Sequence, residues 1–266
     1  YGLQARGLYG DQRPHETFEE MAQAYIAEMR SVQPKGPYLL GGFSGGGITA
    51  YEIALQLLAG GEEVDMLVML DTPLPFRAPL TPRDRALLQM VQLRAKGPAY
   101  VAEWARKGYE WEVERLKKRF DEPEPDKRSD AFRSEEIEAA FRGALERYTL
   151  QKYPGKVLLF RPAIQDVWVV GPGRVIDKDR HYVYPDNGWT PWVDELDVQE
   201  VTVDHDSMVL EPNVRVLARK LRRGIDQVAG ARRARPVPEK PAPVSPARPA
   251  LEESLDQFLS QSKLPT

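Results

Sequence analysis

The feature that most constrains this chain is a glycine-rich run at residues 39–47, which reads Leu-Leu-Gly-Gly-Phe-Ser-Gly-Gly-Gly. An apolar segment leads into this run, and apolar residues at helical spacing follow it. Strand, tight turn and helix, with Gly42-x-Ser44-x-Gly46 at the turn, predict a nucleophile elbow that holds the serine in a strained backbone conformation. Side chains two positions before and two after the serine are expected to clash, which explains glycine at both. The helix dipole and the Gly45 N–H are then placed to stabilise an oxyanion.

The same run permits a second interpretation, which is phosphate binding. A G-x-S-x-G motif arises by chance in about one chain in ten of this size, so the motif alone does not decide. Gly45-x-Gly47-x-x-Ala50 fits a loose dinucleotide-binding fingerprint. Its last position, however, lies inside the predicted helix, and the strand ends several residues earlier. Possible partners of Ser44 elsewhere in the chain therefore carry the argument.

Composition excludes several classes of function. The 266 residues suffice for one α/β domain with appendages or for two small domains. A net charge of −3 gives no electrostatic case for nucleic acid or an anionic membrane. The absence of cysteine excludes a thiol nucleophile, a disulfide framework and a Cys-ligated metal site, and it fits a cytoplasmic location. No apolar run approaches the ~20 residues of a membrane span. The candidates for a general base are His15, His181 and His205.

The order of elements predicts a parallel sheet. Residues 1–4 resemble the end of a strand, and residues 38–42 form the strand before Ser44. Residues 64–70 are almost continuously apolar, as in a strand covered on both faces, and they end at Asp71. Strand, helix and strand in this order imply a right-handed crossover, and chemistry collects beyond the carboxyl ends of such strands.

The middle of the chain has a different character. Residues 73–149 contain several prolines and three helical stretches, and the charged segment 121–130 joins the last two. We expect a helical insertion that splits the sheet. Because it leaves directly from the strand end that carries Asp71, we interpret it as a lid over the site; a peripheral cap without substrate contact is the alternative.

The second half returns to the sheet. Residues 156–160 predict a buried strand, residues 167–170 and 180–184 a two-stranded excursion, and residues 196–203 a half-buried edge strand. A helix is expected from 212 to about 225. The expected organisation is a hydrolase core (1–72), a lid (73–149), the rest of the core (150–229) and a Pro-rich linker (230–250). A tail that is either a short helix or disordered follows (251–266).

Ser44, Asp71 and His205 each follow the end of a predicted strand. The chain order Ser, Asp, His is the one expected of α/β-hydrolases. A serine hydroxyl needs an imidazole to take its proton, and the imidazole needs a carboxylate to fix its tautomer. Asp71 could instead cap a turn, and His205 could be a solvated loop residue. The flanking acids Asp204 and Asp206 are more typical of exposed or capping positions than of the orienting acid.

The chain resembles the thioesterase domain that ends polyketide and nonribosomal peptide synthetases. The resemblance covers residues 1–221. It rests on the start of the chain (1–4), the serine motif (41–46), the acid motif (70–72), the later strand (153–157) and the histidine motif (204–214). It implies an α/β-hydrolase fold with a helical lid.

The resemblance also implies a substrate and a partner. The substrate would be an acyl or peptidyl chain on the phosphopantetheine arm of a carrier protein, and no further cofactor or metal is expected. Ser44 would take the chain as an ester, and water or an internal nucleophile would release it as an acid or a macrocycle. The lid, with Met90, Trp104 and Trp111, would line the acyl pocket.

One departure from the family pattern concerns the start of the chain. Family members carry further strands before the position of Tyr1, and a loop there supplies the second oxyanion N–H. We therefore expect residues 1–266 to be an N-terminally truncated, incomplete catalytic unit, with an apolar edge on the strand before Ser44. An esterase or lipase acting on free esters, and a hydrolase-like scaffold without activity, remain the alternative functions.

Overall fold

The structure, a computed structural model, describes residues 1–9, 12–97, 106, 113, 134–177 and 180–234. Tyr1–Asp226 form one compact unit, and Gln227–Thr266 form a second. None of the described helices combines the length and the apolar character that a bilayer crossing requires.

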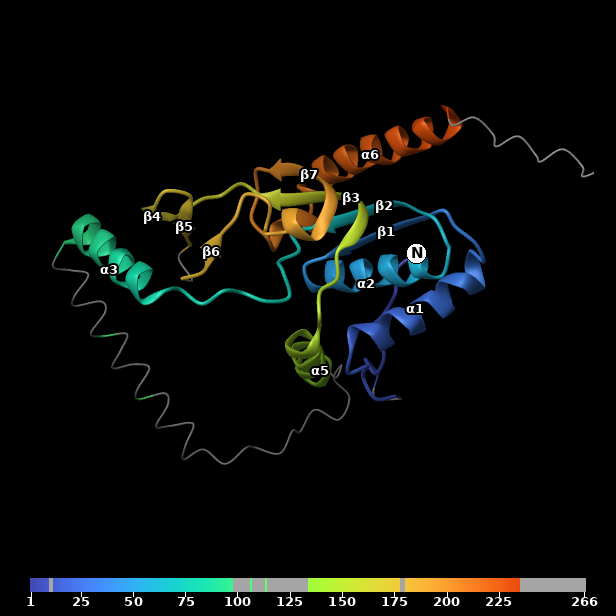
Figure 1. Ribbon diagram of the computed structural model, residues 1–266, viewed down its shortest axis with the longest axis horizontal. Coiled ribbons are helices and arrows are strands. Elements are labelled where there is room, and N and C mark those ends of the chain that lie inside the picture. Colours follow the sequence, from blue (N-terminus) through green and yellow to red (C-terminus); the bar gives the residue numbers. More distant parts are fainter. Residues whose placement is uncertain (10–11, 98–105, 107–112, 114–133, 178–179, 235–266) are drawn as a thin grey trace, which may run out of the picture. The chain divides into compact units, whose positions relative to one another are not determined.

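A parallel four-stranded sheet forms the centre of the first unit (Figure 1). Its strands, in spatial order, are β1 (Tyr38–Phe43), β2 (Val64–Leu70), β3 (Tyr153–Pro162) and β7 (Val193–Val201). This is the predicted α/β architecture. Because β1 is an edge strand and Leu39 is 52% exposed, the expected apolar edge beside Ser44 is present among the described residues.

The register of the strands aligns the ends that carry the site. Phe43 pairs with Leu70, and Leu70 pairs with Phe160, so β1, β2 and β3 end level with one another. Two backbone hydrogen bonds continue this alignment into the loops: Ser44 N–H donates to Leu70 O at 2.8 Å, and Asp71 N–H donates to Phe160 O at 2.6 Å. The residues that follow β1 and β2 are therefore held side by side.

Helices cover both faces of the sheet. On one face lies α2 (Gly45–Ala59), with α1 (Phe18–Val32) beside it (Figure 1). Thr17 caps α1 by accepting a hydrogen bond from Glu20 N–H, as its spacing predicts. On the other face, Gly224 of α6 (Val214–Ala234) packs against side chains of β2 and β3. Burial on both sides explains the continuous apolar sequence of β2.

The main core lies between the sheet and the α1–α2 layer. Its largest fully buried side chains include Phe18, Tyr51, Leu67, Tyr153 and Trp189. The last helix of the predicted insertion, α5 (Ser134–Arg147), also packs against this core through Ala144, with Phe141 and Tyr148 beside it.

A small second sheet follows β3. It contains β4 (Trp168–Gly171), β5 (Arg174–Ile176) and β6 (Tyr182–Val183), all antiparallel. The prediction of a two-stranded excursion was therefore wrong, because the structure has three strands here. The additional strand is the short segment after Gly173, which is too short to show an alternating pattern in the sequence. Helix α3 (Pro82–Lys96) packs against β4.

Other predictions need correction. Residues 1–5 form no strand. Helix α6 continues to Ala234, about nine residues beyond its predicted end and into the segment assigned to the linker, because apolar residues recur at helical spacing up to Val228. Two short 3-10 helices, η1 (Thr190–Trp192) and η2 (Ser207–Val209), complete the described elements. Almost all of the predicted second lid helix, the charged segment 121–130, and residues 235–266 lie outside the described residues.

Candidate active site

Ser44 occupies the turn between β1 and α2. Its backbone angles are φ 52° and ψ −124°, outside the regions that L-residues prefer. A Cβ on Gly42 would overlap the backbone of Gly46, so glycine is required at that position. This is the strained strand–turn–helix geometry that the sequence predicts for a nucleophile elbow.

The second glycine of the motif has a different explanation from the predicted one. A Cβ on Gly46 would meet no atom within 4 Å, so the expected clash at this position was wrong. It is Gly47 that admits no side chain, because a Cβ there would overlap the side chain of Thr72. Thr72 follows Asp71 directly, so the close approach of α2 to the end of β2 depends on Gly47.

The first turn of α2 offers unpaired donors beside Ser44. The helix begins at Gly45, and the first N–H groups of a helix have no intrahelical partner. The hydroxyl of Ser44 makes no hydrogen bond with any described residue. From α5, the ring of Phe141 packs against Gly45, so the last helix of the predicted insertion reaches the elbow directly.

Asp71 and His205 form a hydrogen-bonded pair. Asp71 follows β2 with a positive φ of 44°, and His205 lies in the loop after β7. Asp71 Oδ2 and His205 Nδ1 are 2.7 Å apart, although the residues are 134 positions apart in the chain. Because a carboxylate only accepts, Nδ1 carries the proton, which leaves Nε2 as the basic nitrogen. The side chain of Asp71 is 18% exposed and that of His205 is 39% exposed.

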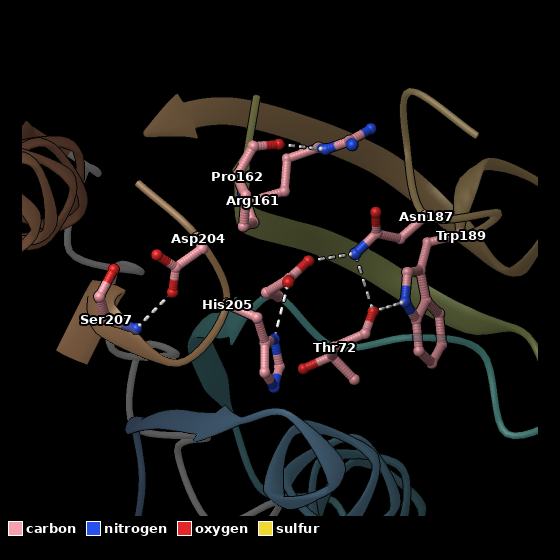
Figure 2. A network of polar contacts seen from close by, with 9 residues as sticks. Thr72, Arg161, Pro162, Asn187, Trp189, Asp204, His205 and Ser207 are labelled. Carbon is pink, nitrogen blue, oxygen red and sulfur yellow. Dashed lines mark hydrogen bonds and ion pairs between the residues drawn. The ribbon is translucent and has the colours of Figure 1, made fainter. Parts of the chain in front are cut away.

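One contact within the histidine loop and one contact with the residue before Ser44 fix the position of His205. The carboxylate of Asp204 accepts a hydrogen bond from Ser207 N–H at 2.8 Å, and this bond holds the pKa of Asp204 below its usual value. The imidazole of His205 stacks on Phe43, which directly precedes Ser44. In Figure 2 the nitrogen of His205 that makes no hydrogen bond faces the ribbon where β1 meets α2.

The surroundings of Asp71 could not be predicted from the sequence. Asn187 Nδ2 donates to Asp71 Oδ1 at 2.9 Å, and the indole of Trp189 donates to Thr72 O at 2.8 Å (Figure 2). Burial lowers the pKa of Arg161. The negative charge of the nearby Asp71 acts in the opposite direction and raises that pKa, but burial is the larger effect. Nothing in the local sequence of residues 186–189 signals their contact with Asp71.

The remaining predicted site residues are less central. Met90 lies on α3 and is 61% exposed, while Trp104 and Trp111 lie outside the described residues. His181 pairs with Asp177 at 3.8 Å on the surface, and His15 is buried against Tyr25.

A cavity of about 1060 Å³ runs along the free edge of β1. It is lined by β1, α1 and the start of the chain, and it reaches Gly46 and Phe141 beside the elbow. Within the part of the chain that the structure describes, neither Asp71 nor His205 lines it. Phe43, which stacks on His205, does line the cavity, so the cavity borders the strand that presents Ser44.

Known proteins resemble parts of this chain. The family model described as "Thioesterase domain" matches residues 1–102. The chain is 49% identical over 73 residues to the polyketide synthase PksR of Bacillus subtilis, which is 27% of this chain and 3% of PksR. It is 28% identical over 220 residues to the malpinin synthetase of Mortierella alpina, which is 78% of this chain and 2% of that protein. The chain spans between 2 and 4% of the length of the curated relatives it matches.

Solved structures show the same fold. The thioesterase domain NocB, in covalent complex with a fluorophosphonate nocardicin G analogue, matches with a TM-score of 0.54 and 24% identity, over 84% of this chain and 81% of NocB. The four-domain nonribosomal peptide synthetase AB3403 matches with a TM-score of 0.52 and 26% identity, over 82% of this chain and 17% of that one. The chain is therefore similar to thioesterase domains over residues 1–102, and it shares its fold with the thioesterase domain NocB and with part of the nonribosomal peptide synthetase AB3403.

Proposed function

We propose that this domain is a serine thioesterase that releases an acyl or peptidyl chain from the phosphopantetheine arm of a carrier protein, in the cytoplasm. The observation that carries the proposal is the 2.7 Å contact between His205 Nδ1 and Asp71 Oδ2, next to a serine held at φ 52°. The relatives support the carrier-bound substrate, because they are multidomain synthases and synthetases.

The residues suit two successive acyl transfers. In the first, His205 Nε2 takes the proton of Ser44 Oγ, the oxygen attacks the thioester carbonyl, and the carrier thiol leaves with that proton. The Gly45 N–H lies where an oxyanion would form, and the α2 dipole favours negative charge there. In the second, His205 takes a proton from water or from an internal hydroxyl or amine of the chain, which attacks the Ser44 ester. The bond between Ser44 Oγ and the acyl carbon breaks, His205 returns the proton to Oγ, and an acid or a macrocycle leaves.

In this scheme Asp71 holds the Nδ1–H tautomer of the histidine and stabilises its cation without taking the proton. The hydroxyl of Ser44 makes no hydrogen bond within the described residues, so its contact with Nε2 forms when substrate binds; hydrogen bonds of this kind are often long in free enzymes.

Two measurements test the proposal on the polypeptide that carries this domain. The first is the rate of acid release from an acyl-pantetheine thioester, compared with p-nitrophenyl ester hydrolysis. The second is mass spectrometry of the protein after reaction with a fluorophosphonate. We expect the thioester to be preferred and a single adduct on Ser44.

Matched variants localise the effect. S44A, H205A and D71N should each lower thioester turnover by about 10³-fold or more. S31A removes an exposed hydroxyl, and H181A and D177N remove the surface His–Asp pair; all three should leave turnover unchanged. Preference for the free ester would assign an esterase, and an intact protein without adduct or turnover would assign a scaffold.

A further inference from the structure

We propose that Asn187 is a positioning residue for the acid of the proposed triad. Its amide holds one carboxylate oxygen of Asp71 so that the other faces His205. This inference rests on the proposed function and adds a residue to the same site.

The hydrogen bonds of Asp71 divide between its two carboxylate oxygens. Oδ2 pairs with His205 Nδ1 at 2.7 Å, and Oδ1 accepts from Asn187 Nδ2 at 2.9 Å. The backbone of Asp71 is fixed by its bond to Phe160 O, but rotation about the bond to the carboxylate group is soft. A donor on each oxygen removes that freedom and directs Oδ2 at the imidazole.

The orientation of the amide follows from its neighbours. Besides Asp71 Oδ1, Asn187 Nδ2 donates to Thr72 O at 3.3 Å. Both partners are acceptors, so an amide oxygen in the place of Nδ2 would face two oxygens and make neither bond. The two protons of the NH₂ group are therefore both donated in hydrogen bonds, one to Asp71 and one to the next residue, Thr72.

The turn that carries Asn187 is tied to the same loop. Asn187 has φ 51° and Gly188 has φ 85°, left-handed conformations that asparagine and glycine tolerate best. Trp189 is fully buried against Tyr51 and donates to Thr72 O. The carbonyl of Thr72 thus accepts from two side chains of one turn, and this holds Asn187 over Asp71.

A neutral donor suits this position. The charged groups around the amide are the carboxylates of Asp71 and Asp186, the guanidinium of Arg161 and the imidazole of His205. Arg161 directs Nη1 to Tyr184 O at 2.6 Å, and Nε to Pro162 O, rather than bonding Asp71. The negative charge of Asp71 therefore remains available to the imidazolium that forms during acyl transfer.

Two variants of Asn187 test the positioning role, one through kcat and the other through the pH dependence of activity. N187G removes the amide and keeps the left-handed backbone free of strain; it should lower kcat by about 10- to 100-fold with KM little changed. N187D places two carboxyl groups in contact, which cannot both be ionised. Its introduced carboxyl donates to Asp71 only when protonated, so the ratio of variant to parent activity should rise as pH falls.

Q56E is the matched control. Gln56 Nε2 donates to the carboxylate of Glu52 at 2.8 Å, so the same amide-to-acid change is made away from the site, and its activity ratio should not change with pH. If N187G and N187D keep the kcat and pH profile of the parent while S44A and H205A are inactive, the positioning role is wrong and the serine mechanism stands.

A readout independent of turnover separates the two proposals. The Nδ1–H proton resonance of His205, assigned by its loss in H205A, should broaden by exchange with water in N187G and persist in Q56E. An unchanged resonance in N187G would overturn the inference even if S44A remained active and the proposed function failed.

Discussion

The imidazole of His205 stacks on the ring of Phe43, with centroids 4.8 Å apart and planes inclined by 26°. Phe43 is the last residue of β1, and Ser44 follows it. The contact therefore ties the imidazole to the strand that presents the serine, while Asp71 holds its other side from β2. The ring of Phe43 limits the positions that His205 Nε2 can take relative to the elbow.

Removing this ring should slow acylation of Ser44. A stacked aromatic pair contributes about 0.5–1.5 kcal/mol, so F43A should lower the rate of fluorophosphonate labelling by about 2- to 10-fold. F43Y keeps the aromatic face and should label at the parent rate. Equal rates for F43A and the parent would show that His205 is positioned without the stack.

The two glycines after the elbow should respond oppositely to alanine. At Gly47 a Cβ overlaps Thr72, and overpacking of this kind costs about 1–3 kcal/mol. At Gly46 the space is open, and alanine should be neutral or stabilise the helix by up to about 1 kcal/mol. Thermal unfolding of G47A and G46A checks this, and similar Tm values for the two variants would contradict it.

The turn that carries Asn187 should depend on pH through Asp186. Burial acts to raise the pKa of Asp186, but hydrogen bonds from the Thr190 side chain and from the N–H groups of Gly188 and Thr190 outweigh it and hold the pKa below 3.8. A lowered pKa means stability that is present above pH 3.8 and is lost as pH falls through the folded-state value.

D186N should therefore lower the free energy of unfolding by about 1–2 kcal/mol at neutral pH, with the difference closing below pH 3.8. Urea unfolding of the variant and the parent at several pH values measures this. D194N, which removes an exposed ion pair with Lys152, should cost at most about 1 kcal/mol. A D186N difference that does not shrink as pH falls below 3.8 would rule out the ionised carboxylate as its cause.

The residue that follows α5 is attached to the core through a hydrogen bond to the buried Glu52. Tyr148 O–H donates to Glu52 Oε2 at 2.7 Å. Burial is the largest cause that raises the pKa of Tyr148, and this hydrogen bond is the second largest. Y148F would leave a buried carboxylate oxygen without its donor and should cost about 1–3 kcal/mol in thermal unfolding.

Two comparisons sharpen the prediction for Tyr148. Y38F removes a bond to a neutral carbonyl and should cost less, about 0.5–1.5 kcal/mol. The double variant Y148F/E52Q should recover part of the loss, because the uncompensated charge is gone. A Y148F variant as stable as the parent would show that water replaces the tyrosine.

Local sequence determined the framework of the site. The glycine run determined the elbow, the apolar run before Asp71 determined a strand buried on both faces, and one histidine after a late strand was the natural partner. These features follow from interactions within a few residues: steric limits at a turn, alternation along a strand and capping of a helix. The pairing of Asp71 with His205 was predictable because parallel strands bring their carboxyl ends to one edge.

Only the tertiary structure decided what surrounds that framework. Asn187 meets Asp71 across 116 positions in the chain, and Phe141 reaches Gly45 from α5, the last helix of the predicted insertion. Such contacts depend on how packed elements converge, and a turn sequence is the same whether or not it faces a carboxylate. Gly47 illustrates the difference: its place in a glycine run was visible in the sequence, but its reason is a threonine brought close by the neighbouring strand.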